Sequence, residues 1–324
     1  MRRILSIDGG GIKGVFPASF LAAVEDSVGR PLADYFDLVV GTSTGGIIAL
    51  GLGLGLSAKQ ILDFYIRYGP SIFCGNRLLR VMRGIGVSKY SPAPLKNALT
   101  ETFGNRRLGE SQKRLVIPSF NLDSGEVHVW KTSHHPRLDR DYKVSVVDVA
   151  LSTAAAPTYF PTHRGAAGTP LLDDGMWANN PVAVAVVEAI GILGWNPADL
   201  RVLSLGCTTT PLDVDWGRSR PVGALYWGLK IADVFMTAQA SSAMGMAQHL
   251  IGDRANLVRI SPIVGKRFGL DTVKEMPSLM GLGDTEARKA LPTIRSLFFE
   301  YPTAEPFEPC HRLEGRGCGD KGSR

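Results

Sequence analysis

Residues 2–14 of the chain read RRILSIDGGGIKG. A run of aliphatic residues ends at Asp8 and continues into a glycine-rich loop, as at the junction of a buried strand and a helix. Gly9, Gly11 and Gly14 satisfy G-x-G-x-x-G, the pattern of loops whose backbone N–H groups face the phosphates of a dinucleotide. The same N–H groups can stabilise a transient oxyanion, so the loop alone leaves both functions open.

Composition sets the limits within which that loop is interpreted. The chain has 324 residues, 44% hydrophobic and 20% charged, which is ample for a sizeable core. The formal net charge of +6 suits contact with anionic lipid or nucleotide but does not select a partner. The longest apolar stretch, residues 45–56, is about half of what a bilayer-spanning helix needs. We therefore expect a cytoplasmic protein that reaches membranes from the water side.

The cysteines give no sign of a disulfide framework or a metal site. Cys74, Cys207, Cys310 and Cys318 form no C-x-x-C pair and have no zinc-ligand spacing. Reduced thiols in an intracellular chain are the simplest interpretation, and we expect no metal or resident cofactor.

Short apolar runs alternate with longer segments of helical period, which predicts an α/β fold with a central, mostly parallel sheet flanked by helices. The expected strands are 4–7, 38–40, 115–120, 127–130, 202–205 and 257–260. The expected helices follow Gly14, Thr44, Ser57, Pro92, Val146, Pro181 and Thr285. Residues 1–302 are expected to form one domain, and residues 303–324, rich in proline, glycine and charge, a flexible tail.

A second loop carries a candidate nucleophile. In FDLVVGTSTGGIIAL, residues 36–50, an expected strand runs into Gly41-Thr42-Ser43-Thr44-Gly45 and then into an aliphatic helix. A nucleophile elbow needs small residues two positions before and after its serine, because the turn leaves no room for side chains there. The alternative is an ordinary glycine-rich turn that happens to contain a serine.

A serine needs a base, and the sequence offers a carboxylate more readily than a histidine. Asp173-Asp174-Gly175 follows a short apolar run and precedes Asn179-Asn180-Pro181, which opens an expected helix. The alternative is a purely structural role, in which this segment forms an Asx turn and Asp174 or Asn180 caps a helix. Only His249 and His311 follow Asp174, one in an amphipathic run and one in the tail, so a Ser-Asp dyad is favoured over a triad.

In combination, these motifs resemble the patatin-like phospholipases. Asp8 to Gly14, Gly41 to Gly45, STAAAPTYFP at 152–161 and Asp174-Gly175 ahead of Ala178-Asn179-Asn180-Pro181 occur in that family's order and at about its separations, over residues 4–260. The resemblance implies the family's three-layer fold.

The resemblance also assigns roles to individual residues. It implies that Ser43 is the nucleophile, that Asp174 is the general base, and that the N–H groups of Gly9, Gly10 and Gly11 form the oxyanion hole. Lys13 stands where the family has Arg or Lys. The remaining motif residues would support these groups: Asp8, Gly14, Gly41, Gly45 and Gly175. Met176 departs from the family's usual Asp-Gly-Gly or Asp-Gly-Ala.

The implied function is hydrolysis of acyl esters of membrane phospholipids, of the phospholipase A type, through an acyl-enzyme. Stand-alone bacterial members of the family include effectors of antiphage (CBASS) operons that a cyclic dinucleotide activates, and this chain looks similar to them. The expected partners are membrane phospholipid and a cyclic dinucleotide, with no DNA or RNA, and a homo-oligomer is left open. We expect peripheral association with the inner membrane when the enzyme is active.

Two segments combine apolar and basic residues in a way that is compatible with membrane docking. Residues 69–86 place Arg77, Arg80 and Arg83 among aliphatic side chains, and residues 265–283 form a weaker candidate. Each could equally be an ordinary surface segment.

Three other functions stay open at the level of sequence. One is a constitutive lipid acyl hydrolase or thioesterase of lipid turnover, and another is a non-catalytic sensor of lipid or nucleotide. The third is a Rossmann dinucleotide-binding protein, but that fold expects an acidic residue at the end of its second strand, where this chain has Gly41-Thr42-Ser43.

Overall fold

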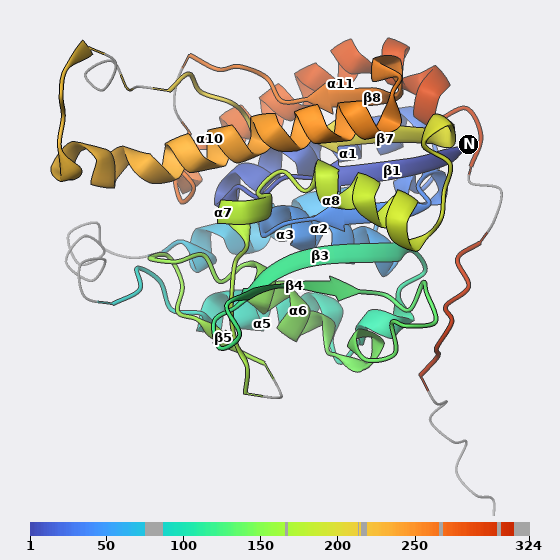
Figure 1. The fold of residues 1–324 in the computed structure, drawn as a ribbon, viewed down its shortest axis with the longest axis horizontal. Helices are drawn as coiled ribbons and strands as arrows, with labels where there is room; N and C mark the ends of the chain where they lie inside the picture. The colour runs from blue at the N-terminus through green and yellow to red at the C-terminus, as the bar shows by residue number, and fades with distance from the viewer. Residues whose placement is uncertain are drawn as a thin grey trace, which may run out of the picture.

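The computed structural model describes residues 1–74, 87–165, 168–212, 214, 219–265, 268–302 and 306–313 (Figure 1). Within these residues, eight strands form one sheet. Five of them run parallel in the order β3 (Arg114–Asn121), β2 (Leu38–Gly41), β1 (Arg2–Ile7), β7 (Leu200–Leu205) and β8 (Leu257–Ile260). At one side, β3 pairs antiparallel with β4 (Glu126–Lys131) and β6 (Pro170–Leu172), and β6 pairs with β5 (His163–Arg164). The predicted α/β class with a mostly parallel sheet is confirmed.

The strands are buried on both faces because their side chains alternate between two cores. Leu5, Ile7 and Val39 point to one core, and Ile4 and Leu38 point to the other. The first core is covered by α1 (Val15–Val28), α2 (Thr44–Gly53), α3 (Ala58–Ile72), α5 (Ala93–Phe103), α6 (Val146–Thr153) and α11 (Met276–Phe298). The second is covered by α8 (Val182–Val187) and α10 (Ala224–Ile251). The molecule therefore has the three layers expected of it.

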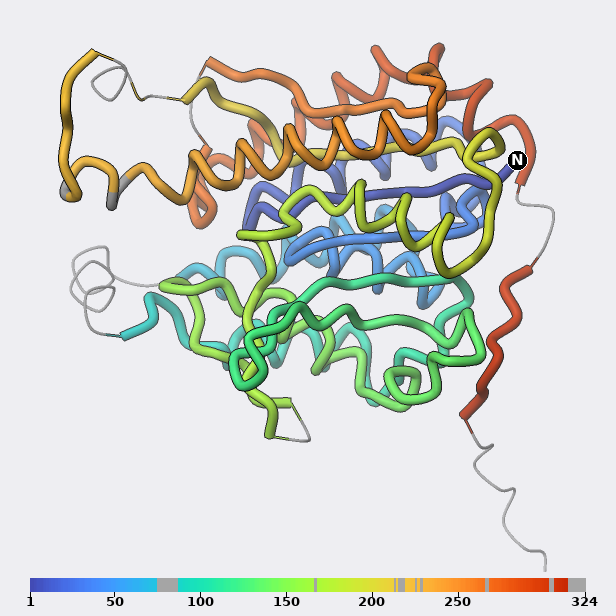
Figure 2. Tube along the Cα trace, in the orientation of Figure 1, coloured from blue at the N-terminus to red at the C-terminus, as the bar shows by residue number. Residues whose placement is uncertain are grey.

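The topology brings the expected loops to one end of the sheet. Since β1 and β2 are parallel neighbours with Ile7 opposite Gly41, the loops that follow them leave the sheet side by side. The short helix α7 (Gly175–Ala178) lies at the same end, and α10 crosses above it along the outside of α8 (Figures 1 and 2). Ligand sites of open parallel sheets form at the carboxyl ends of the strands, so this end is where a site is expected.

The structure differs from the expected elements in three places. The short strands β5 and β6 and the 28-residue helix α10 have no counterpart in the sequence analysis. Helix α11 begins at Met276 rather than after Thr285, with a proline at its first turn, where the missing N–H costs nothing. A Cβ on Gly283 would lie 2.6 Å from the Phe16 carbonyl oxygen, so this glycine allows α11 to pack closely on α1.

Part of the expected tail is docked on the domain. The backbone N–H of Cys310 donates to the Ser133 carbonyl at 2.7 Å, and the His311 ring stacks on Tyr142. Cys310 and His311 therefore contact the domain surface near Ser133 and Tyr142, and the flexible tail stays a prediction for the rest of the segment. Residues 303–305 and 314–324 lie outside the described residues.

Candidate active site

Ser43 sits at the predicted elbow between β2 and α2. Its backbone has φ 56° and ψ −121°, a conformation that is costly for a residue with a side chain and that is concentrated at functional sites. A Cβ on Gly41 would lie 2.1 Å from the Gly45 carbonyl oxygen, and one on Gly45 would lie 2.3 Å from the Ile7 carbonyl oxygen. The two glycines are therefore required by the tightness of the turn, as the sequence predicted.

The elbow is held by hydrogen bonds from both sides. The Ser43 backbone N–H donates to Thr153 Oγ1 at 2.9 Å, and that hydroxyl donates to the Pro118 carbonyl at 2.7 Å. Thr42 Oγ1 donates to the Ala178 carbonyl at 2.6 Å, which ties the elbow to α7. These bonds satisfy the buried polar groups around the strained residue.

The glycine-rich loop after β1 lies against Ser43, since a Cβ on Gly9 would be 3.2 Å from the serine Cβ. The Gly9 N–H, however, donates to the Asn179 carbonyl at 2.9 Å. Within the described residues, the N–H groups of Gly10 and Gly11 have no hydrogen-bond partner. The expectation that Gly9 donates to an oxyanion does not agree with this bond, because Gly9 uses its N–H to join the loop to α7, and Gly10 and Gly11 remain the candidate donors.

The loop is fixed by close packing. A Cβ on Gly10 would lie 2.6 Å from Cys207 Sγ, and one on Gly14 would lie 2.2 Å from Thr44 Oγ1. Gly11 has φ +58°, and its Cβ would be 2.3 Å from the Leu270 carbonyl oxygen. That carbonyl accepts the Ile12 N–H at 2.8 Å. The loop is therefore closely confined by its neighbours.

A buried ion pair anchors the start of the loop. Arg259, on β8, donates from Nη1 to Asp8 Oδ1 at 2.7 Å and to Ser204 Oγ at 2.8 Å, and its Nη2 bonds to Asp8 Oδ2. Burial alone would lower the pKa of Arg259, but the Asp8 carboxylate outweighs burial and raises it. Sequence reasoning gave Arg259 no role, because only the fold brings it beside Asp8.

The carboxylate that contacts Ser43 belongs to Asp173, which lines the same cavity. Its Oδ1 also accepts the Gly175 N–H at 2.9 Å, which closes a local turn. Burial raises the pKa of Asp173 to about 7, against the opposing effects of the hydrogen bonds from Ser43 and Gly175.

Asp174 points elsewhere. Its side chain is only 3% exposed and, within the described residues, its Oδ2 has no hydrogen-bond partner. Burial, followed by the charge of Asp173, raises the pKa of Asp174 to about 8. The prediction that Asp174 contacts Ser43 is corrected in favour of Asp173. Consecutive side chains leaving β6 point in different directions, and two adjacent aspartates hide which one faces the serine.

The segment after α7 is clamped by α10. Asn180 Oδ1 accepts the Val182 N–H at 3.1 Å, an Asx-type turn that satisfies the first N–H of α8, and the N-cap residue itself is Pro181. Gln239 of α10 accepts the Asn180 N–H at 2.9 Å and donates to the Asn180 carbonyl at 3.1 Å. The position of α7, and with it Asp173, therefore depends on a helix that the sequence analysis did not identify.

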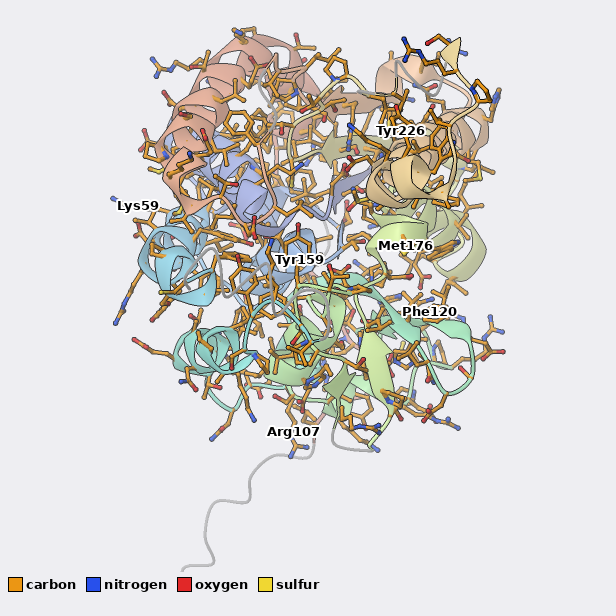
Figure 3. The ribbon with its side chains drawn as sticks, turned by 90° about the vertical axis from the view of Figure 1, so that its left-hand side faces the viewer. Lys59, Arg107, Phe120, Tyr159, Met176 and Tyr226 are labelled. Carbon is orange, nitrogen blue, oxygen red and sulfur yellow. The ribbon has the colours of Figure 1, made fainter. Side chains whose placement is uncertain are left out.

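Ser43, Asp173, Lys13 and the glycine loop open into one cavity of about 1110 Å³. Much of its wall is apolar, formed by Ile47, Phe64, Ile72, Phe73, Leu95 and Phe160. Figure 3 views the molecule from the left of Figure 1, with Tyr159 near the centre of the face and Met176 beside it. The cavity has the size and lining that an acyl chain requires.

No histidine lines the described part of this cavity. His134 is buried against Glu188, at 2.9 Å, and His249 is exposed on α10. His311 Nε2 donates to the Pro136 carbonyl at 2.7 Å, away from the cavity. The arrangement therefore pairs the serine with a carboxylate rather than with an imidazole.

The structure describes only one of the two segments that were expected to dock on a membrane in enough detail to place it. Arg77, Arg80 and Arg83 lie outside the described residues. In the segment 265–283, Leu270 packs on the glycine loop, and Met276 and Leu279 are buried in α11. Much of that second segment is therefore part of the core and the site. Among the described residues, no helix is both long enough and apolar enough to cross a membrane.

Comparison with known proteins matches the chain to one family. The sequence model of the patatin-like phospholipase family matches residues 5–186 of the chain. The chain is 36% identical over 252 residues to a cGAMP-activated phospholipase of Pseudomonas aeruginosa, covering 77% of this chain and 75% of that protein. It is 34% identical over 228 residues to a cGAMP-activated phospholipase of Vibrio cholerae, and spans 63% of the length of that relative. It is 29% identical to patatin-like protein 2 of Arabidopsis thaliana over 90% of this chain and 84% of that protein.

Proposed function

The chain belongs to the patatin-like phospholipase family, and we propose that it hydrolyses the acyl esters of membrane phospholipids with Ser43 as nucleophile and Asp173 as general base. The observation that carries the proposal is the meeting of three groups in one apolar cavity. These are a serine held at positive φ, a buried carboxylate hydrogen bonded to it, and two N–H groups of a rigid glycine loop.

In the first half of the reaction, Asp173 accepts the hydroxyl proton while Ser43 Oγ attacks the ester carbonyl carbon. The N–H groups of Gly10 and Gly11 donate to the oxyanion of the tetrahedral intermediate. As the intermediate collapses, the bond to the alcohol oxygen breaks and Asp173 returns the proton to that oxygen. The lysophospholipid leaves, and the fatty acyl group stays on Ser43.

In the second half, water takes the place of the alcohol. Asp173 accepts a proton from the water as it attacks the acyl carbonyl, and the same two N–H groups stabilise the second oxyanion. Ser43 Oγ then leaves and recovers the proton from Asp173, and the fatty acid is released. A carboxylate is a weak base at its ordinary pKa, so the raised pKa of Asp173 brings it nearer to the optimum for proton transfer at neutral pH.

We further propose that a cyclic dinucleotide activates the enzyme and that it acts as an antiviral effector at the inner membrane. The support is its similarity to two bacterial proteins named cGAMP-activated phospholipases. A constitutive hydrolase or thioesterase is the competing proposal within the family, and a sensor without catalysis is the alternative from another class. Membership of the family leaves the Rossmann alternative without support.

The test measures fatty acid release from vesicles of phosphatidylethanolamine and phosphatidylglycerol, with and without a panel of cyclic di- and trinucleotides. We expect release only with one nucleotide and none from Ser43→Ala. Retained release by Ser43→Ala would overturn the hydrolase. Full release without any nucleotide would overturn the activation, and labelling of Ser43 by a fluorophosphonate probe would exclude the non-catalytic sensor.

A further inference from the structure

The mouth of the cavity is lined by uncharged side chains. Among the described residues that line the cavity, those that are also largely exposed include no Asp, Glu, Lys, Arg or His. Met176, 59% exposed, and Ile263, 77% exposed, are the largest apolar members. The other members are small or carry a hydroxyl group: Pro157, Thr158, Thr209, Pro211, Ala232, Thr237, Ser241 and Gly265. We call this set the rim.

The apolar surface extends beyond the rim on two elements. Trp177 follows Met176 on α7 and is about half exposed, and Ile231 and Phe235 flank the rim residue Ala232 on α10. Figure 1 shows the N-terminal half of α10 extending past the sheet at the end where α7 lies. Large exposed apolar side chains that surround the entrance of a cavity are typical of an interaction site rather than of an ordinary surface.

The charged residues that line the cavity are all less exposed than the rim, and two of them, Lys230 and Asp233, lie close to the rim residue Ala232 on α10. Asp8 and Arg259 neutralise each other beneath the glycine loop, and Asp173 is bonded to Ser43. Lys89 and Asp271 also pair, at 2.6 Å, beside Tyr159. An acyl chain that crosses the rim from an apolar medium therefore meets only uncharged side chains among the largely exposed residues that line the entrance.

We propose that the rim, with Trp177, Ile231 and Phe235, docks on the surface of a phospholipid bilayer and admits a lipid acyl chain directly from it. This proposal rests on the proposed function and deepens it. Continuity with the cavity selects the occupant, because a protein seated over the rim would cover the entrance through which substrate reaches Ser43. A tryptophan and aliphatic side chains at the contact match what membrane interfaces accept. The net charge of +6 adds attraction to anionic lipid.

The direct test is sedimentation with phosphatidylethanolamine–phosphatidylglycerol vesicles, in the presence and absence of cGAMP. All variants are made in the Ser43→Ala background, so that binding is measured without hydrolysis. Met176→Glu and Ile263→Glu should each weaken binding by about tenfold, the change expected when one buried aliphatic side chain is lost from an interface. The matched controls are Leu122→Glu and Val187→Glu, which add the same charge at residues that are 46% and 55% exposed and do not line the cavity.

A second measurement uses the active enzyme and compares vesicle hydrolysis with hydrolysis of monomeric p-nitrophenyl butyrate. The rim variants should lower the ratio of the two rates, because only the vesicle reaction needs docking. Unchanged vesicle binding by both rim variants, or an equal loss by the controls, would overturn the proposal. The proposal would also be overturned if a rim variant changed the oligomeric mass of the protein in solution but not its binding to vesicles. The rim would then be an interface between copies of the chain. The binding result does not depend on catalysis, so it separates failure of docking from failure of the hydrolase.

Discussion

The Ser43 hydroxyl is hydrogen bonded to Asp173, while Asp174, the next residue in the chain, is buried with an oxygen that has no partner among the described residues. The two carboxylates are chemically identical and one position apart, yet only one faces the serine. The difference arises because Asp173 directly follows β6, whereas Asp174 is the N-cap of α7, which begins at Gly175. Substitution of each aspartate in turn can therefore distinguish the roles of Asp173 and Asp174.

Asp173→Asn should abolish hydrolysis nearly as completely as Ser43→Ala, because the amide cannot accept the serine proton. The loss in kcat should be about 10²–10⁴, the usual contribution of a positioned base. Asp174→Asn is the matched control, with the same change of atoms one residue later, and it should retain most of kcat. Steady-state kinetics on a soluble ester would measure both. The reverse order of effects would show that Asp174 is the base.

The acid limb of the pH profile of kcat/KM should reflect the ionisation of the Asp173 carboxyl group. Burial raises the pKa of Asp173 to about 7, and only the ionised form can accept a proton. The value of kcat/KM should therefore rise with pH and level off above about 7. Asp174→Asn should keep this limb, because Asp174, with a pKa of about 8, is mainly protonated when Asp173 ionises. A profile that stays flat down to pH 5 would contradict the assignment.

Gly10→Ala should damage the oxyanion hole. The new Cβ would lie 2.6 Å from Cys207 Sγ, which is buried and cannot move aside easily, so the Gly10 N–H must shift. Loss of one oxyanion donor costs about 10²–10³ in kcat. Adding Cys207→Gly should recover part of the activity, since it removes the atoms in conflict. Gly245→Ala on α10, where nothing lies within 4 Å, is the control and should leave kcat unchanged.

The sequence predicted those parts of the site that local chain geometry determines. The elbow at Ser43 follows from glycines two positions to either side, and the glycine-rich loop beside it follows from a strand ending in glycines. The contacts that the sequence did not reveal join distant segments. The bond from Gly9 to Asn179 removes one donor, and Arg259 lies 251 residues from its partner Asp8. Helix α10 was missed because its stretch carries few charges and so lacks a clear polar face.

The single substitution Arg259→Met should destabilise the protein more than the double substitution that combines it with Asp8→Asn. Methionine keeps much of the volume but leaves Asp8 buried without its counter-charge, which costs about 3–5 kcal/mol. The double variant removes that charge as well, so its loss of unfolding free energy should be smaller. Urea denaturation of the four proteins of this cycle measures the coupling. Strictly additive losses would mean that the ion pair does not hold the loop.

Asp174→Asn should stabilise the protein, and the gain should grow with pH. Burial raises the pKa of Asp174 from 3.8 to about 8, so the folded state holds its proton over a range in which the unfolded chain releases it. Wild-type stability is therefore lost progressively as pH rises from about 4 to 8, and asparagine has no proton to release. Below pH 4 the two proteins should melt together, and at pH 8 the variant should have the higher Tm. Asp173 is present in both proteins, and its charge adds to the effect of burial on the pKa of Asp174. Thermal melts across this range that stay parallel would mean that Asp174 is ionised in the folded protein at neutral pH.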